Sequence, residues 1–325
     1  MKRLVLIGPG NIAKYHIEAM MHFNFELVGC ISREGSNASV NFMNDMGKAS
    51  SEYFNEIDFM LKNKDSWDAV LICCPSKNQL EYIDLLASYE KPILVEKPVS
   101  FSPNNLNRYK HNNKIMVSFN RRYYESINKL KSFISKNKEF FVSINIPESS
   151  KSINVSSPSK FLPISIYENS IHIFDLINYL FGDVKWLNAI SSSENKLEFM
   201  SVHGRSSLNI PISLNLMLDS PENFSISINE TNKKIQLKPI EVFKKYQGFE
   251  VYEPSIETPI RRYEPKLIEE VYSEPIKNCK PGFYKQAKVF SELCDDKKNH
   301  SFPNINDAIN AINSIQSISK LIEEN

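Results

Sequence analysis

Two glycines one residue apart follow a short apolar run near the start of the chain. In the string GPGNIA they are Gly8 and Gly10, and Ala13 stands three residues further on. Gly8 permits a sharp turn, Gly10 lets the backbone approach a pyrophosphate, and Ala13 lets a helix pack closely on a sheet. The helix start, at Asn11 and Ile12, supplies N–H donors for phosphates. Because the turn follows the first strand-like run and uses two of only nine glycines, we favour a dinucleotide site over a plain strand-to-helix turn.

The residues after the second apolar run bear on which dinucleotide binds. An acid at this place would hold the ribose 2′-hydroxyl of NAD. Ser32 and Arg33 stand there instead. A hydroxyl with a guanidinium can bind a 2′-phosphate, which a carboxylate would repel. The sequence therefore favours NADP(H), with NAD(H) possible, and an ordinary exposed loop arginine is the alternative interpretation.

Titratable side chains gather at two further places. Glu96 and Lys97 end an apolar run, and neighbours on a strand point to opposite sides, so the acid need not neutralise the lysine. Further along, Glu168, His172 and Asp175 fall at i, i+4 and i+7, which places them on one face of a single expected helix. Each group also has an ordinary interpretation, as a solvated strand end and as the wet side of a helix.

Apolar runs and helix-like segments alternate over the first 120 residues. The apolar runs, which are typical of strands buried on both faces, are residues 4–8, 25–31, 67–74, 92–98 and 114–119. Between them lie segments such as 78–90, whose apolar residues recur every three or four positions. This alternation predicts a doubly wound parallel sheet, and we expect a dinucleotide-binding domain over residues 1–120.

The remaining residues, 121–325, show other patterns. A helix is expected over 167–181. Apolar and polar residues alternate in 206–218 and again in 223–229, which predicts antiparallel strands with one covered face. The other face is rich in Ser and Asn and almost free of charge, so it is either solvated or packed against a second subunit. We expect a substrate-binding and oligomerisation domain here.

Composition argues against several classes of protein. The 325 residues are 42% hydrophobic and 24% charged, with a net charge of +1, so the basic excess of a nucleic-acid binder is missing. No apolar stretch has the length of a membrane span, and the N-terminus lacks the layout of a secretion signal. The five cysteines form neither a CxxC pair nor a Cys/His spacing, which argues against disulfides and a metal site. We expect a cytoplasmic location.

Six segments, in this order, resemble the glucose–fructose oxidoreductase/inositol dehydrogenase/MocA (Gfo/Idh/MocA) family. They are GPGNIA, DAVLICCPSKNQLEYI, PILVEKPVS, VSFNRRYYESI, YENSIHIFDLINYLFGDVK and KPGFYKQAKVF. The resemblance covers essentially the whole chain. It implies a Rossmann domain followed by an α/β domain with a large, mostly antiparallel open sheet, which would join subunits into a homodimer or homotetramer. It also implies a nicotinamide cofactor and a sugar, polyol or sugar-nucleotide substrate.

The resemblance also implies roles for particular residues. The family's catalytic lysine, whose bond to the next proline is often cis, corresponds to Lys97, and its catalytic histidine corresponds to His172. Asp175 would bind a substrate hydroxyl, and Arg122 a substrate phosphate or carboxylate. By the same resemblance, the positions that line the cofactor are Cys74, Pro75, Ser76, Glu96, Lys97 and Asn120.

Two positions depart from the family pattern. The family's usual aspartate, four residues before the histidine, is Glu168 here, which is one methylene longer. We keep it as a catalytic candidate, although a displacement of about 1 Å can cost roughly 100-fold in rate. The family also often has a histidine where this chain has Asn78 or Gln79, and we expect no chemical role there.

The implied reaction is reversible hydride transfer. His172 would accept the proton of the substrate hydroxyl, and Lys97 would orient that hydroxyl and stabilise negative charge on its oxygen. Two alternatives remain open: a cofactor-binding regulatory protein of the same fold without turnover, and an NAD-dependent glycosidase that uses oxidation only transiently.

Overall fold

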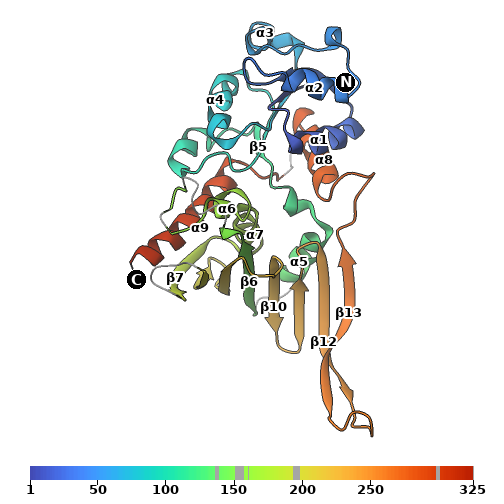
Figure 1. Ribbon diagram of the computed structural model, residues 1–325, viewed down its shortest axis with the longest axis vertical. Helices are drawn as coiled ribbons and strands as arrows, with labels where there is room; N and C mark the ends of the chain where they lie inside the picture. Colours follow the sequence, from blue (N-terminus) through green and yellow to red (C-terminus); the bar gives the residue numbers. More distant parts are fainter. Residues whose placement is uncertain (136–138, 151–156, 160, 193–197, 298–300, 325) are drawn as a thin grey trace. The chain divides into compact units, whose positions relative to one another are not determined.

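The computed structural model describes all residues except 136–138, 151–156, 160, 193–197, 298–300 and 325. The chain divides into two compact units (Figure 1). Unit 1 contains Met1–Tyr123 and Pro275–Ile312, and unit 2 contains Tyr124–Glu274 and Asn313–Asn325. The chain first passes from unit 1 to unit 2 after Tyr123, whereas the boundary was expected at residue 120. The division differs from the expectation in one respect, because the segment from Pro275 to Ile312 returns to unit 1.

Unit 1 is built on a five-stranded parallel sheet with the strand order β2-β1-β3-β4-β5. Its strands are β1 (Lys2–Ile7), β2 (Phe25–Ile31), β3 (Ala69–Ile72), β4 (Ile93–Val95) and β5 (Ile115–Val117). They are buried on both faces, as the apolar runs predict. The strand order reverses between β1 and β3, and in such sheets ligands bind at the carboxyl ends of the strands around this point.

The helices of unit 1 come from both of its chain segments. They are α1 (Asn11–Met20), α2 (Ala38–Asp45), α3 (Ile57–Lys62), α4 (Ser76–Leu86) and α8 (Phe283–Cys294), with 3-10 turns at Met21–Phe23, Ser50–Glu52, Lys64–Ser66, Ala87–Tyr89, Pro103–Tyr109 and Asn120–Tyr123. Helix α8 contacts α1, and its Phe290 stacks on Phe25 with ring centroids 5.7 Å apart. This packing draws the C-terminal segment into the core of unit 1.

Unit 2 is built on an eight-stranded sheet with the order β13-β12-β11-β10-β6-β9-β8-β7. Its strands are β6 (Phe141–Glu148), β7 (Val184–Ser191), β8 (Phe199–Ser206), β9 (Pro211–Leu218), β10 (Ser225–Glu230), β11 (Lys233–Leu237), β12 (Val242–Tyr252) and β13 (Arg262–Tyr272). Every pair is antiparallel except β6 with β9. The fold class implied by the resemblance, a parallel Rossmann sheet plus a large and mostly antiparallel one, is confirmed.

Four helices accompany the second sheet in the described part of the chain. They are α5 (Glu125–Ile134), α6 (Ile164–Glu168), α7 (Ile171–Phe181) and α9 (Ile305–Glu323), the last of which begins in unit 1 and ends in unit 2. Helix α7 is buried on nearly all sides, and the sheet contributes the alternating Val142, Ile144 and Ile146 to the core. Across the described residues, none of the helices combines the length and the apolar character needed to cross a bilayer.

Candidate active site

The glycine turn lies directly after β1 and has the geometry that a dinucleotide site needs. Gly8 has φ +87°, and a Cβ built there would lie 2.4 Å from the backbone nitrogen of Cys74, which follows β3. Only glycine fits this close approach and this backbone conformation. By contrast, a Cβ on Gly10 would meet nothing within 4 Å. Gly10 precedes α1, and Ala13 is fully buried. The open space beside Gly10, at a helix N-terminus, fits a phosphate group.

The loop after β2 holds the two residues that we expect near the adenine ribose. Ser32 is half-buried, and its hydroxyl donates a hydrogen bond to the Ser36 carbonyl oxygen at 3.2 Å. It also lies 3.1 Å from the hydroxyl of Ser39. Arg33 and the next residue, Glu34, are exposed. Ser32 therefore shapes the loop, while Arg33 is the cation that this loop presents to solvent.

The segment after β3 begins α4 and contains the expected cofactor residues Cys74, Pro75 and Ser76. Gln79, for which we expected no chemical role, is only 2% exposed. Its side-chain amide donates a hydrogen bond of 3.0 Å to the Cys74 carbonyl oxygen. Gln79 therefore holds the carbonyl group of Cys74, the residue whose backbone nitrogen lies against Gly8.

Lys97 follows β4 at the same end of the sheet. Its backbone N–H donates to Glu96 Oε2 at 3.1 Å, and the Lys97–Pro98 bond is cis, as the resemblance implies. The Glu96 carboxylate is buried and accepts a hydrogen bond from the Ser118 hydroxyl at 2.8 Å. Its other partner is His16 Nε2, 2.7 Å from Oε1. We expected Glu96 to line the cofactor, but the structure places its carboxylate in contact with protein groups.

These contacts have a clear electrostatic result. Burial by itself raises the pKa of Glu96. The hydrogen bond from His16, the charge of Lys97 and the Ser118 hydroxyl act in the opposite direction and hold the pKa below its usual value. Glu96 is therefore an ionised carboxylate inside unit 1, and its charge is balanced by neighbouring donors.

Sequence reasoning missed three members of this cluster: His16, Ser118 and Gln286 on α8. Gln286 Nε2 lies 3.4 Å from His16 Nδ1 and 3.2 Å from the Ser118 hydroxyl. With Nε2 of His16 donating to Glu96, Nδ1 is the acceptor for Gln286. The ring of Phe283 meets the His16 ring edge-on at a centroid distance of 4.7 Å. The signal in the sequence was the string KPGFYKQAKVF, whose polar Gln286 sits among residues that pack in the core.

Arg122 and Asn120 have structural partners. The guanidinium of Arg122 is 7% exposed, and its Nη2 lies 2.8 Å from Asp307 Oδ1. The Asn120 amide donates to the Pro281 carbonyl oxygen at 3.4 Å. Because the buried guanidinium of Arg122 is paired with the partly exposed Asp307, the structure gives no support to its expected substrate contact. Asn120 connects the end of β5 to the segment that leads into α8.

His172 and Asp175 lie on α7 in unit 2, whereas Lys97 lies in unit 1. His172 is 5% exposed and Asp175 is 1% exposed. The expected continuous helix is wrong, because α6 ends at Glu168 and α7 begins at Ile171. Glu168 is exposed on the last turn of α6. The i, i+4 relationship that would join Glu168 to His172 therefore does not hold.

The break before α7 is held by Glu148 at the end of β6, which sequence reasoning also missed. The Asn169 amide donates to Glu148 Oε1 at 3.0 Å, and the Ser170 hydroxyl donates to the same oxygen. Burial raises the pKa of Glu148, although these hydrogen bonds act against the rise. Polar residues at 169 and 170 can leave the helix because a buried acceptor satisfies them.

Residues 2–115 match the Gfo/Idh/MocA model, described as an oxidoreductase family with an NAD-binding Rossmann fold. The uncharacterized oxidoreductase YrbE of Bacillus subtilis is 26% identical over 191 residues, which cover 54% of this chain and 53% of that protein. The match thus spans about half the length of this curated relative.

Solved structures share the fold over nearly the whole chain. An NAD binding oxidoreductase from Klebsiella pneumoniae has a TM-score of 0.76 at 11% identity, with 99% of this chain and 96% of that chain covered. Levoglucosan dehydrogenase in complex with NADH and L-sorbose has a TM-score of 0.74 at 13% identity, with 99% and 97% covered. At these identities the likeness concerns the fold.

Proposed function

Because residues 2–115 belong to the Gfo/Idh/MocA oxidoreductase family with its NAD-binding Rossmann fold, we propose that this chain is a sugar, polyol or sugar-nucleotide dehydrogenase or reductase. It transfers a hydride between a nicotinamide and a hydroxyl or keto carbon. The observation that carries this proposal is the setting of Lys97, which follows β4 at the sheet end that also holds the glycine turn. The shared fold with levoglucosan dehydrogenase, described with NADH and L-sorbose, supports a sugar substrate.

Backbone groups would hold most of the cofactor. The N–H groups of Asn11 and Ile12, at the start of α1 beside the open space at Gly10, would hold the pyrophosphate. The nicotinamide side would meet Cys74, Pro75, Ser76 and Lys97. When bound, the nicotinamide supplies the hydride donor or acceptor, and the protein supplies the alignment. Glu96 and Gln79 would act behind the cofactor, through their hydrogen bonds to the Lys97 N–H and the Cys74 carbonyl oxygen, whereas Asn120 holds the Pro281 carbonyl oxygen.

NADP(H) is the preferred cofactor in this proposal. The exposed guanidinium of Arg33 would pair with a 2′-phosphate at the end of β2, where a hydroxyl and not a carboxylate comes first. One feature of this loop favours NAD(H). The exposed Glu34 follows Arg33 in the chain, and its carboxylate could accept a hydrogen bond from a ribose hydroxyl.

The two titratable side chains divide the chemistry. As hydride leaves the substrate carbon, its hydroxyl must lose a proton, and the imidazole of His172 accepts it. The ammonium of Lys97 orients the same oxygen and stabilises its developing charge. Asp175, buried one turn further along α7, binds a neighbouring substrate hydroxyl. Glu168 is left out of this chemistry because of its exposed place on α6.

A coupled screen tests the proposal. The protein is mixed with NAD⁺, NADP⁺, NADH or NADPH and a panel of sugars, polyols and sugar nucleotides, and nicotinamide absorbance is followed. Substrate-dependent net change supports a dehydrogenase or reductase. Release of a free sugar without net change would point to the glycosidase alternative. Cofactor binding without turnover across the panel would favour the regulatory alternative.

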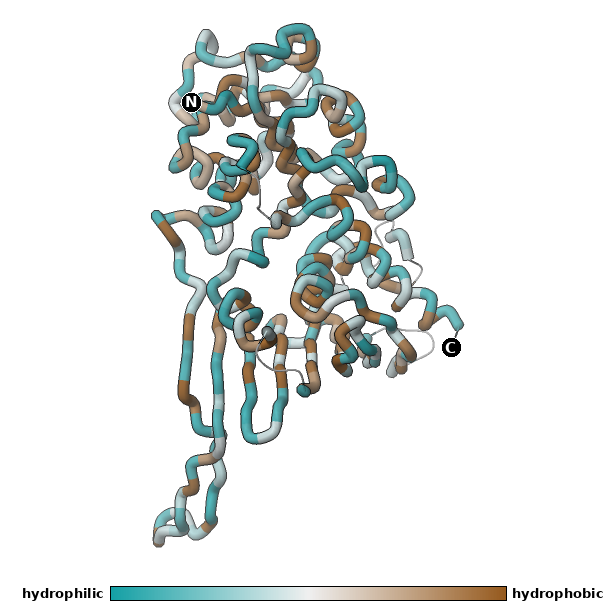
Figure 2. The backbone as a smooth tube through the Cα atoms, turned by 180° about the vertical axis from the view of Figure 1, so that it is seen from behind, coloured by the Kyte–Doolittle hydropathy of each residue, from teal (hydrophilic) through white to brown (hydrophobic). Residues whose placement is uncertain are grey.

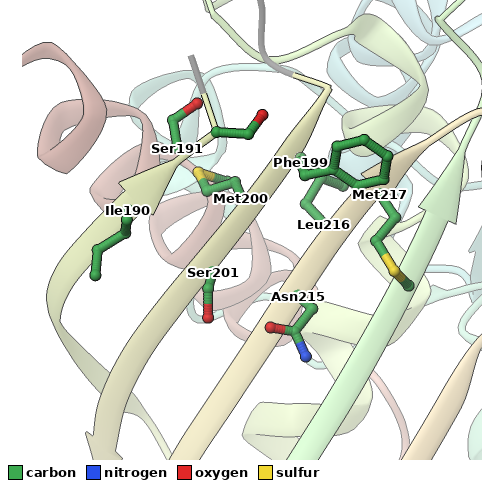
Figure 3. A pocket seen from close by; sticks show the side chains of 9 residues that line it. Ile190, Ser191, Phe199, Met200, Ser201, Asn215, Leu216 and Met217 are labelled. Atoms are coloured by element: carbon green, nitrogen blue, oxygen red, sulfur yellow. The ribbon is translucent and has the colours of Figure 1, made fainter. Parts of the chain in front are cut away.

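The uncovered face of the second sheet supports self-association as a homodimer or homotetramer. In its centre, Ser143 pairs with Ser213, which pairs with His203, and none of these side chains carries a fixed charge. At the ends of β7, β8 and β9 this sheet has a shallow hollow of about 350 Å³ (Figure 3). The cross-strand pair Phe199 and Met217 lies side by side there.

A reducing compartment such as the cytoplasm fits the cysteines. All five thiols are free, whereas proteins of oxidising compartments commonly use theirs in disulfides. Burial raises the pKa of the Cys30 thiol to about 12 and that of Cys74 to about 11. These thiols are therefore poor nucleophiles at neutral pH.

A further inference from the structure

Strands β12 and β13 continue past the rest of their sheet as a two-stranded arm. Strand β11 pairs with β12 only as far as Gln247. Beyond Gln247, β12 keeps its pairing with β13 but no longer pairs with β11. We call residues 246–267 the arm. Figure 1 shows it projecting beyond the neighbouring strands of unit 2, and Figure 2 shows hydrophobic stretches along both of its strands.

The two faces of the arm differ in chemistry. Residues paired across two antiparallel strands share a face. The front face is made by the apolar pairs Tyr246–Leu267, Phe249–Pro265 and Val251–Tyr263. The back face is made by the polar pairs Glu250–Glu264 and Tyr252–Arg262. The arm is therefore amphipathic. Among the described strands and helices, none pairs with β12 or β13 beyond Gln247 other than these two with each other.

A bulge keeps the apolar residues on one face. From the pair Tyr246–Leu267 to the pair Phe249–Pro265, strand β12 advances by three residues and strand β13 by two. The extra residue is absorbed at Gln247–Gly248, where Gly248 has φ +66°. Without this bulge, Phe249 and Val251 would join the charged back face. A specific backbone feature thus keeps the front face apolar.

The front face is strongly exposed within one chain. Phe249 is 64% exposed, Tyr263 59% and Val251 49%. A two-stranded hairpin by itself is only marginally stable in water, and it gains stability when an apolar face is covered. Exposed apolar surface of this extent and continuity is typical of an interaction site.

A second copy of this chain is the partner that fits. The front face continues through Tyr246 and its neighbour Lys234 onto the uncovered face of the sheet, for which self-association is proposed above. Within the arm, Arg261 forms an ion pair with Glu253 and Arg262 with Glu264, and Lys244 pairs with Glu270 just before the arm begins. The three pairs of the front face contain no charged side chain, so two copies would meet through them without like charges opposing one another.

The area of the front face also favours a second copy of this chain as the partner. Three aromatic rings and three smaller apolar side chains expose a few hundred Å², whereas a stable interface takes roughly 800 Å² from each partner. The arm alone is too small, and it needs the adjoining sheet face to complete an interface. We infer that the front face of the arm packs against a second copy and extends the contact made by the sheet. This inference rests on the proposed self-association and is independent of the proposed reaction.

Sedimentation equilibrium of matched variants over about 1–100 μM tests the inference. Val251→Lys places a charge on the front face, and Glu250→Lys places the same side chain one residue away on the back face. We expect the first to weaken self-association at least about 10-fold, as truncating a buried interface residue does, and the second to change it less than about twofold. Phe249→Ser is a second front-face variant, and circular dichroism checks that each variant folds.

A third variant separates the arm from the sheet. Ser143→Arg places a charge in the centre of the uncovered sheet face. If Ser143→Arg weakens association while both front-face variants associate like the wild type, the arm inference is overturned and the sheet proposal stands. Equal weakening by Val251→Lys and Glu250→Lys would also overturn it, because the effect would not depend on the face. A wild type that stays monomeric at the highest concentration overturns both the arm and the sheet proposals. The hydride-transfer proposal is not affected by that result, because sedimentation measures the mass of the protein and does not depend on turnover.

Discussion

His16 on α1 lies 2.7 Å, from Nε2 to Oε1, from Glu96 at the end of β4. This single contact joins the helix that follows the glycine turn to the residue that precedes Lys97. Glu96 in turn accepts the backbone N–H of Lys97 at 3.1 Å. The glycine turn and Lys97 are therefore linked through the buried pair of His16 and Glu96. Gln286, from a segment 270 positions away from His16, completes the connection.

Glu96→Gln tests the charge of this pair. Since the pKa of Glu96 is held below the ordinary glutamate value of 4.5, folding favours the ionised form. Its contribution is fully present above about pH 4.5 and is lost as the pH falls through the folded-state pKa. We expect E96Q to lower the free energy of unfolding by about 1–3 kcal/mol near pH 7, with a smaller loss near pH 4. Urea unfolding at both pH values measures this. A pH-independent loss would contradict the assignment of an ionised Glu96.

Glu148→Gln should behave in the opposite way. Burial raises the pKa of Glu148, so folding favours the protonated form. The stability that this group contributes is therefore present below about pH 4.5 and is lost as the pH rises through the folded-state pKa. The amide of the substituted side chain would keep an oxygen for Asn169 and Ser170 without the charge. We expect E148Q to be at least as stable as the wild type near pH 7 and to lose any advantage near pH 4, in the same urea series. Marked destabilisation at pH 7 alone would show that the carboxylate is ionised and needed.

Gly8 and Gly10 should separate folding from cofactor binding. At Gly10 a Cβ meets nothing within 4 Å and φ is −91°, so Gly10→Ala should change the free energy of unfolding by less than about 0.5 kcal/mol. It should nevertheless raise the Kd for NADPH and NADH about 10-fold or more, because the methyl group fills the space that a pyrophosphate needs. Gly8→Ala, with its clash at Cys74 and positive φ, should destabilise by roughly 1–3 kcal/mol. Fluorescence titration and urea unfolding give both numbers, and unchanged affinity in G10A would place the phosphates elsewhere.

Arg33→Ala tests the preference between cofactors. If the guanidinium pairs with the 2′-phosphate, loss of that charge-assisted contact should raise the Kd for NADPH about 10-fold. The Kd for NADH should change less than about twofold, because NADH has no phosphate there. Titrations of both cofactors against both proteins measure the difference. Parallel changes for NADPH and NADH would remove Arg33 from the discrimination.

Much of the fold was predictable from local patterns, because buried parallel strands are short apolar runs and half-buried strands alternate. The run 25–31 coincides with β2, and the alternation around 211–218 is β9. The same alternation misled at its start, where Asn209 has φ 65° and the chain turns from β8 into β9. The arm gave no such pattern, because its bulge at 247–248 interrupts the period of two.

The site was less predictable where it depends on tertiary contacts. The glycine turn and the cis Lys97–Pro98 bond lie within short motifs, so the sequence and the family resemblance indicated them. The spacing of Glu168 and His172 suggested one helix, but Glu148 satisfies the polar groups at a break between two. Arg122 looked available because its partner, Asp307, is far away in the sequence. His16 and Gln286 were missed for the same reason.

The most direct test of the account compares Lys97→Ala with the wild type on the substrate that the screen identifies. Lost electrostatic stabilisation of the reacting oxygen should lower kcat by roughly 100- to 1000-fold, while the Kd for the nicotinamide cofactor changes only a few-fold. That result is what a lysine acting on the hydride-transfer oxygen predicts. Turnover by K97A at the wild-type rate would contradict the central claim, whatever the fold and the cofactor affinity.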